Sequence, residues 1–221
     1  MANPVEAATS ITRVFLLDDH SAVRRGVADV LDTEPDLEVV GQASTGAEAL
    51  TCVPALAPDV AVLDVRLPDG DGVTVCRELR SRVPGVHCML LTSMAEEHAL
   101  LAAILAGAAA YQLKQIRATA LIAAIRAVAA GRSSPDPQLR AAAVLRALSA
   151  SAAADPAKQL SERERTAVAL IIEGMTNRDI GERMALPEEA VRGLVSDLLD
   201  KVGLQRRISS TAAPSDLAVD G

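Results

Sequence analysis

The chain has 221 residues, of which 50% are apolar and 23% charged, a composition that supports a folded core and excludes a disordered chain. Its only aromatic residues are Phe15 and Tyr111, so a stacking platform for single-stranded nucleic acid is excluded. The net charge of −7 argues against a broadly basic nucleic-acid coat but leaves room for one local contact helix.

The cysteines and the N-terminus indicate the cellular compartment. Cys52, Cys76 and Cys88 are odd in number and lack metal-ligand spacing, which is typical of reduced thiols in a cytoplasmic protein. The first residues lack the basic start and apolar core of a signal peptide. The longest apolar run, Ala99–Leu113, is shorter than the ~20 residues of a membrane span. We therefore expect a cytoplasmic protein with no membrane partner.

The first part of the chain, residues 11–131, alternates short apolar runs with amphipathic segments. The predicted strands cover residues 13–17, 37–43, 60–64, 86–92 and 109–113. The predicted helices cover residues 21–33, 45–56, 73–82, 96–106 and 116–130. Strands that are apolar throughout and separated by helices indicate a parallel sheet covered on both faces. The prediction is a doubly wound α/β fold of five βα units, with its ligand site at the carboxyl edge of the sheet.

The second part is predicted to be all-helical. Residues 132–158 form a linker that contains one helix, Gln138–Ala152. Ser161 and Glu164 have the spacing of a capping box, and Thr176 caps a short helix, Asn177–Met184. A longer helix follows from Pro187. Short helices joined by a tight turn predict a helix-turn-helix over residues 159–207, followed by a poorly ordered tail over residues 208–221.

Polar residues follow the predicted strands where each strand ends. Asp18 and Asp19 follow the first strand, Asp64 ends the third, Thr92 ends the fourth and Lys114 follows the fifth. Converging carboxylates repel one another unless a cation joins them, and Mg²⁺ prefers such oxygen ligands. A carboxylate beside this metal can attack phosphorus, since the metal neutralises charge on both groups. Lys114 and Thr92 would then hold the oxygens of the resulting acyl phosphate.

Each of these residues also has a plainer explanation when it is taken alone. A single aspartate at a strand end is usually a turn former, Lys114 alone would be a solvated residue, and Thr92 alone could cap a helix. The ordered set at successive strand ends is much harder to obtain by chance. Tyr111 stays open, because it suits either a switch aromatic that follows Thr92 or an ordinary residue at an amphipathic edge.

The motifs resemble those of a known family. VFLLDDH, AVLDVRLPDGDG, LLTS and GAAAYQLKQI resemble, in order and spacing, the receiver domain of a two-component response regulator. The segment from LSERERT to LLDKVGL resembles a LuxR-type DNA-binding domain. Together they are similar to the NarL/FixJ class, over about residues 11–207. Gln115 departs from the proline or aspartate that is common after the lysine, which affects the loop rather than the chemistry.

The resemblance implies specific roles and partners. Asp64 would be the phosphoacceptor, and a Mg²⁺ cofactor would be held by Asp18, Asp19, Asp64 and the backbone carbonyl of Arg66. Thr92, Tyr111 and Lys114 would be the switch residues. The implied partners are a cognate sensor histidine kinase, DNA and a second copy of the chain in a homodimer.

In this family the helix that corresponds to the one starting at Pro187 enters the DNA major groove. The expected DNA-binding residues are Arg178, Arg183, Glu188, Glu189, Arg192, Gly193 and Ser196. The groove-facing side of the helix is unusually acidic: Glu189 and Gly193 stand where relatives carry Lys and Asn, and Asp197 replaces another basic residue. Residues 160–207 hold nine acidic and eight basic side chains. Because phosphate neutralisation supplies much of DNA affinity, we expect weak binding.

Three functions compete. The first is a phosphorylation-controlled, dimeric transcription regulator. The second is a phosphate-receiving signalling protein whose degenerate recognition helix binds DNA weakly or not at all and which acts through protein partners. The third, a phosphatase or other small α/β hydrolase, is disfavoured by the helical second part and by the lack of a second acid–base group. The chain is not expected to be an enzyme.

Overall fold

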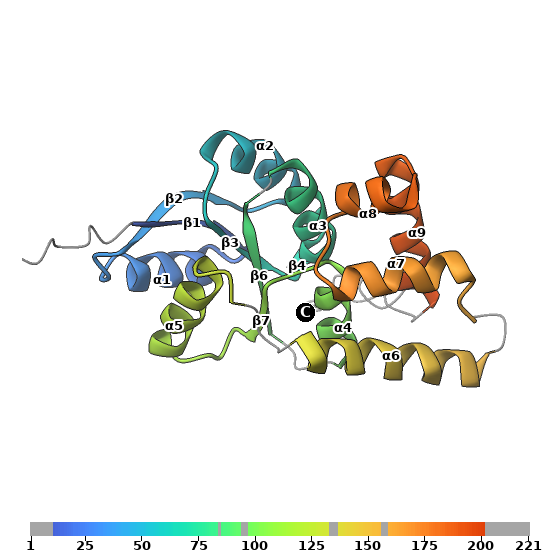
Figure 1. Cartoon of the computed structure of the whole chain (residues 1–221). Coiled ribbons are helices and arrows are strands. Elements are labelled where there is room, and N and C mark those ends of the chain that lie inside the picture. The colour runs from blue at the N-terminus through green and yellow to red at the C-terminus, as the bar shows by residue number, and fades with distance from the viewer. Residues whose placement is uncertain (1–10, 84, 94–96, 133–136, 156–158, 202–221) are drawn as a thin grey trace, which may run out of the picture.

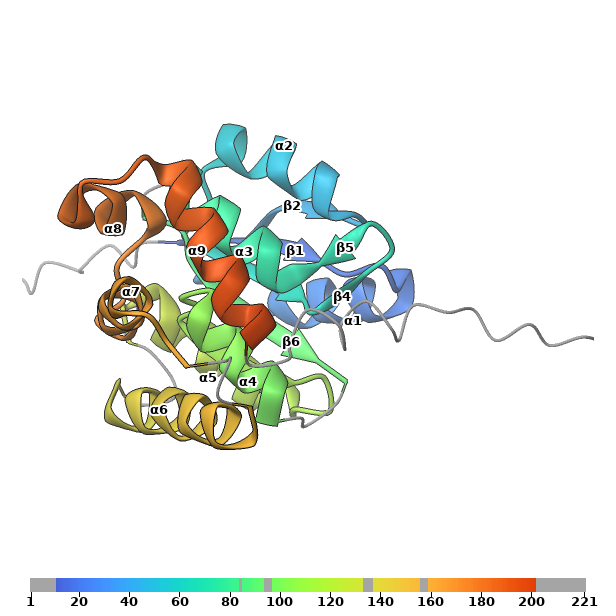
Figure 2. The same ribbon diagram turned by 90° about the vertical axis from the view of Figure 1, so that its right-hand side faces the viewer.

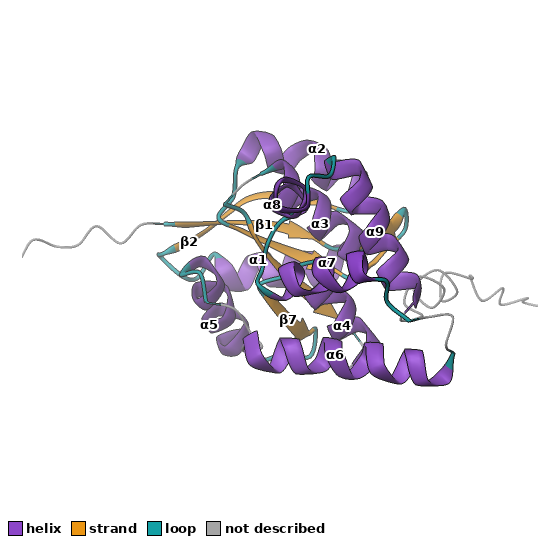
Figure 3. Cartoon of the chain, turned by 45° about the vertical axis from the view of Figure 1, so that its right-hand side comes forward, coloured by secondary structure: helices purple, strands orange, loops and turns teal. Residues whose placement is uncertain are grey.

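The computed structural model describes residues 11–83, 85–93, 97–132, 137–155 and 159–201 (Figure 1). A parallel five-stranded sheet, in the order β2-β1-β3-β6-β7, forms the centre of the first part (Figure 3). Its elements are β1 (Thr12–Leu17), α1 (Ser21–Leu31), β2 (Leu37–Ala43), α2 (Gly46–Leu56), β3 (Val60–Asp64), β4 (Arg66–Leu67), β5 (Gly70–Asp71), α3 (Gly72–Arg82), β6 (His87–Thr92), α4 (Glu97–Leu105), β7 (Ala110–Leu113) and α5 (Ala118–Ala129). The helices α6 (Pro137–Ala154), α7 (Glu162–Ile172), α8 (Asn177–Met184) and α9 (Glu188–Lys201) follow.

The doubly wound fold and the helix-turn-helix predicted from the sequence are confirmed. β2, β3 and α8 have the predicted ends, and the other predicted strands and helices shift by a few residues at their ends. The structure adds a short antiparallel hairpin of β4 and β5, between β3 and α3, which was not among the predicted elements. The predicted tail, residues 208–221, lies outside the described residues.

Both faces of the sheet are covered, as the continuous apolar strands require. Residues of β3 from Val60 to Leu63 are at most 3% exposed. One cluster of buried residues joins the sheet to α2, α3 and α4, and a second joins its other face to α1 and α5. Gly107 and Gly131, with φ of 74° and 72°, follow α4 and α5 in the left-handed conformation that ends many helices.

The second part is held by caps and by an apolar stripe. Ser161 with Glu164, and Thr176 with Asp179, form the capping boxes at the starts of α7 and α8. Buried residues of α9 pack against α7 and α8; they are Val191, Val195, Leu198 and Leu199. At the far end of α9, Lys201 Nζ lies 2.7 Å from a Glu164 carboxylate oxygen of α7. None of the described helices combines the length and apolarity that a bilayer crossing requires.

The two parts pack against each other. α4 contacts α6, α7 and α9, and α3 contacts α8. Figure 2 shows α9 crossing in front of α3 and α4. Apolar residues fill most of α4, and a helix that is apolar all round is normally buried. The part of the long apolar run that forms α4 therefore lies in a core shared by the two parts, since the cluster around α2 to α4 continues into α7, α8 and α9.

A pair of glycine variants tests the packing within the first part. At Gly72 a Cβ would lie 1.9 Å from the backbone oxygen of Asp64, whereas at Gly26, inside α1, it would meet no atom within 4 Å. Gly72→Ala should lower the free energy of unfolding by about 1–3 kcal/mol through steric overlap. Gly26→Ala should raise it by about 0.5–1 kcal/mol, because alanine is the better helix former. Urea denaturation measures both values, and equal stabilities would contradict the packing.

Candidate functional site

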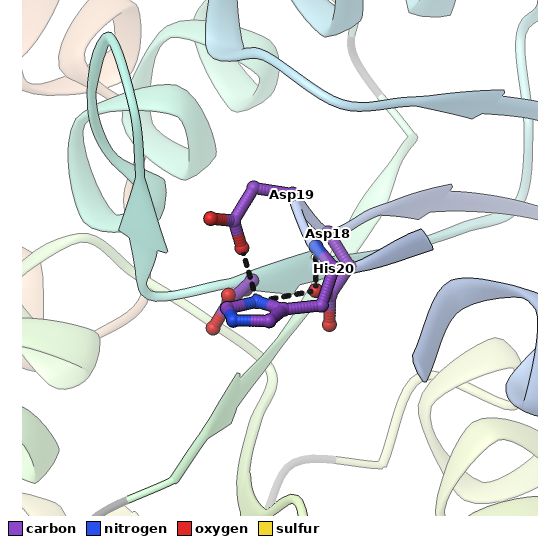
Figure 4. A group of neighbouring side chains, drawn as sticks. Asp18, Asp19 and His20 are labelled. Carbon is purple, nitrogen blue, oxygen red and sulfur yellow. Dashed lines mark hydrogen bonds and ion pairs between the residues drawn. The ribbon is translucent and has the colours of Figure 1, made fainter. Parts of the chain in front are cut away.

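The ends of β1 and β3 bring two aspartates together. Leu17 of β1 pairs with Leu63 of β3, so the residues that follow them, Asp18 and Asp64, lie at the same edge of the sheet. Asp18 is 5% exposed and Asp64 is 3% exposed. The side chain of Asp19, one residue further along, is 33% exposed (Figure 4). The sequence prediction of converging carboxylates at this edge is therefore met by the geometry.

Lys114 joins these two carboxylates. Its Nζ lies 2.7 Å from Asp18 Oδ2 and 2.8 Å from Asp64 Oδ2. Burial acts to lower the pKa of Lys114, but the hydrogen bonds to Asp18 and Asp64 outweigh it and raise the pKa above its ordinary value. The ammonium group therefore stays charged and compensates part of the negative charge of the pocket.

At Asp64, unlike Lys114, burial has a larger effect on the pKa than the hydrogen bonds. Burial raises the pKa of Asp64 above its ordinary value, although the hydrogen bond from Lys114 opposes this. The backbone N–H of Arg66 also donates to this carboxylate and lowers its pKa. Ionised Asp64 is thus an incompletely compensated charge, a condition that favours the arrival of a further cation.

Thr92 and Lys114 are fixed beside each other by the backbone. The N–H of Lys114 donates to the carbonyl oxygen of Thr92 at 2.7 Å, and Thr92 is 4% exposed. Gln115 also bonds within this loop, where its side-chain Nε2 donates to the carbonyl oxygen of Ser93 at 3.3 Å. Tyr111 is half-buried on β7 and packs against the cluster of α2 to α4, which leaves both interpretations of this residue open.

The oxygen donors suit a hard divalent cation. One donor atom from each of Asp18, Asp19, His20 and Asp64 lies within 4.8 Å of the others. Carboxylate oxygens are the ligands that Mg²⁺ prefers, and a small protein ligand set leaves room for water and phosphate. The Arg66 side chain is exposed at the start of β4, and the role of its backbone carbonyl stays a prediction.

The predicted DNA-contacting side of α9 is partly engaged within the protein. Arg192 Nη1 lies 3.3 Å from Glu78 Oε1 of α3, and its Nη2 lies 3.3 Å from Glu189. Glu189 and Gly193 are exposed, whereas Glu188 and Ser196 are half-buried. The predicted phosphate contacts on α8, Arg178 and Arg183, are exposed. The basic residue of this side of α9 thus already has acidic partners.

Further polar contacts across this interface were not predicted from the sequence. Arg77 of α3 is 9% exposed and donates to Asn177 Oδ1 of α8 at 3.0 Å, with no carboxylate contact within the described chain. Burial lowers the pKa of Arg77 to about 10. Arg80 donates to the carbonyl oxygen of Gly174 at 2.8 Å. The sequence feature that could have indicated these contacts is an arginine, Arg77, among the apolar positions of the amphipathic helix α3.

Known proteins match both parts of the chain. Residues 14–126 match the response regulator receiver domain, and residues 158–212 match the bacterial regulatory proteins of the luxR family. The DNA-binding transcriptional activator DevR/DosR of Mycobacterium tuberculosis is 46% identical over 207 residues, covering 94% of this chain and 95% of that protein. The transcriptional regulatory protein LiaR of Bacillus subtilis is 32% identical over 88% of this chain and 92% of its own.

Solved structures agree with these matches. The receiver domain of NarL from Mycobacterium tuberculosis superposes with a TM-score of 0.54 and 36% identity, over 56% of this chain and 99% of that one. The response regulator ChrA of a heme-sensing two-component system superposes with a TM-score of 0.50 and 33% identity, over 92% of this chain and 96% of that one.

Removing the lysine tests the balance of charge in the pocket. Lys114→Met leaves Asp18 and Asp64 without their shared cation, so the free energy of unfolding should fall by about 1–3 kcal/mol at pH 7 in EDTA. Because the pKa of Asp64 is raised, its proton returns early as the pH falls, and a neutral carboxyl needs no cation. The loss should therefore shrink toward pH 5. Urea denaturation at both pH values measures it, and an equal loss at both would contradict this account.

Proposed function

The chain belongs to the response regulators of the NarL/FixJ class, which join a receiver domain to a LuxR-type DNA-binding domain, and we propose that Asp64 accepts its phosphoryl group. The observation that carries this proposal is the position of Asp64: its buried carboxylate faces Asp18 and is held by Lys114. The matches agree with the resemblance drawn from the motifs and with regulation of transcription. The donor would be a phosphohistidine of a cognate sensor kinase.

The transfer follows from this geometry. A carboxylate oxygen of Asp64 attacks phosphorus, the P–N bond of the donor breaks, and its electron pair leaves with the histidine. Lys114 pairs with the acyl phosphate, and the Thr92 hydroxyl bonds one of its oxygens. Asp18, Asp19, Asp64 and the Arg66 carbonyl would hold Mg²⁺, which when bound neutralises charge on the phosphoryl oxygens.

Control of DNA binding would follow from the contact between the two parts. Arg192 pairs with Glu78 of α3, and this pair would compete with a contact between Arg192 and a DNA phosphate. Reorganisation around Thr92 at the end of β6 would weaken the neighbouring contacts of α4 with α7 and α9. The released domains would then pair on DNA as a homodimer.

One observation favours the second function, a phosphate-receiving protein that binds DNA weakly or not at all. Glu189 and Asp197 are exposed on α9, so acidic charge faces the solvent where DNA would dock. A phosphate-receiving protein that acts through protein partners accounts for this surface. Acids that accept hydrogen bonds from cytosine account for it equally well, since such contacts are known in groove helices.

The phosphoacceptor is tested by mass. After incubation with acetyl phosphate and Mg²⁺, the wild-type protein should gain one phosphoryl group and Asp64→Asn should gain none, because an amide is a poor nucleophile. EDTA should abolish the gain in the wild type. Intact-mass spectrometry reads all three samples. An undiminished adduct in Asp64→Asn would show that another residue accepts the group.

The contact between Arg192 and Glu78 is tested by DNA affinity without phosphorylation. Glu78→Gln removes the carboxylate partner, so the unphosphorylated protein should bind promoter DNA about fivefold more tightly, the equivalent of about 1 kcal/mol. Asp29→Asn, an exposed position on α1, makes the same change in net charge and should have less effect. Fluorescence anisotropy measures both variants, and equal gains would mean that net charge alone is responsible.

The acidic surface of α9 is tested by restoring basic and polar side chains. Glu189→Lys together with Gly193→Asn should raise DNA affinity and steepen its salt dependence, by a slope of ~0.9 for each added phosphate contact. Anisotropy across a salt series measures both quantities on the phosphorylated proteins. Tight binding by the wild type at physiological salt, with no gain in the variant, would show that the acids read bases or are merely solvated.

A further inference from the structure

His20 lies inside the acidic cluster rather than beside it. Its Nδ1 is 2.5 Å from Asp19 Oδ1 and 3.5 Å from Asp18 Oδ1. Figure 4 shows the imidazole ring turned toward these two carboxylates. The backbone supports this arrangement, because the N–H of His20 also donates to Asp18 Oδ1, at 2.9 Å. His20 is the residue before α1, and its side chain makes no capping hydrogen bond to the helix, so helix capping does not explain the position of the ring.

The spacing of these atoms is that of neighbouring ligands on one ion. Metal–nitrogen and metal–oxygen bonds of about 2.1 Å at right angles place two donor atoms about 3 Å apart. The two separations from His20 Nδ1, 2.5 Å and 3.5 Å, lie on either side of this value. The 65% exposure of the His20 side chain leaves room for the ring to rotate.

We propose that His20 is a nitrogen ligand of the divalent ion in this pocket, which gives the pocket a preference for imidazole-binding metals that carboxylates alone do not provide. The inference rests on the metal site of the proposed function. The other donors are oxygen, which suits Mg²⁺, whereas imidazole favours later divalent ions such as Co²⁺, Ni²⁺ and Zn²⁺. The opposing possibility is that His20 only donates a hydrogen bond to Asp19 and is displaced when an ion binds.

Two measurements on the full chain separate these possibilities. Pulsed EPR of the protein loaded with Mn²⁺ detects a directly bound nitrogen by its nuclear modulation. Calorimetric titration with Mg²⁺ and with Co²⁺ gives the affinities. The variant is His20→Gln, and the matched control is His87→Gln, on β6 and outside the acidic cluster. Thermal unfolding of both variants in EDTA verifies that they are folded.

We expect nitrogen modulation in the wild type and in His87→Gln, and none in His20→Gln. The affinity for Co²⁺ should fall at least tenfold in His20→Gln, while the affinity for Mg²⁺ should change less than threefold. Binding of Mn²⁺ without nitrogen modulation in the wild type, or an unchanged Co²⁺ affinity in His20→Gln, overturns the role of His20 but leaves the proposed function standing. Failure of all three ions to bind overturns the metal site itself, and this inference with it.

Discussion

Two buried carboxylates in contact with one lysine set the conditions for the rest of the pocket. Burial, and to a lesser extent repulsion from Asp18, raises the pKa of Asp64, and the contact with Lys114 offsets only part of this. Parallel strands impose this conflict, because they deliver their carboxyl ends to one edge of the sheet. The receiver thus folds with negative charge at this edge that Lys114 offsets only in part and that a divalent cation can compensate further.

The sheet that forms the pocket also leads into the contact between the two parts of the chain. β6 ends at Thr92 in the pocket, and the helix that follows it, α4, is shared with α6, α7 and α9. One short stretch of chain therefore touches both the site that would receive phosphate and the domain that would bind DNA. This continuity gives a physical route between them, since the buried cluster on that side of the sheet extends into α9 without interruption.

Local patterns predicted most of the fold, and the reasons for the differences are physical. Both ends of the strand β3 and both ends of the capped helix α8 could be predicted, because apolar runs and caps are local signals. Asp18, Asp64 and Lys114 could be brought together because parallel topology fixes where strands end. The pairing of Arg77 with Asn177 could not be predicted, since 100 residues separate them and only docking joins them. The position of His20 depends on a side-chain rotamer, which no sequence pattern fixes.

The docked interface leaves several polar atoms without partners. Among the described residues, Ser81 Oγ, Asn177 Nδ2 and Arg192 Nε are buried with no hydrogen bond, and Arg77 is a buried cation with no carboxylate at ion-pair distance. Each such group subtracts from the apolar gain of docking. Each such group therefore lowers the free energy that favours the docked arrangement, and each ~1.4 kcal/mol shifts the ratio of docked to undocked chains tenfold. The DNA-binding activity of the protein without a signal would then depend on a few unpaired polar groups at this interface. Single substitutions of these groups would raise or lower that activity.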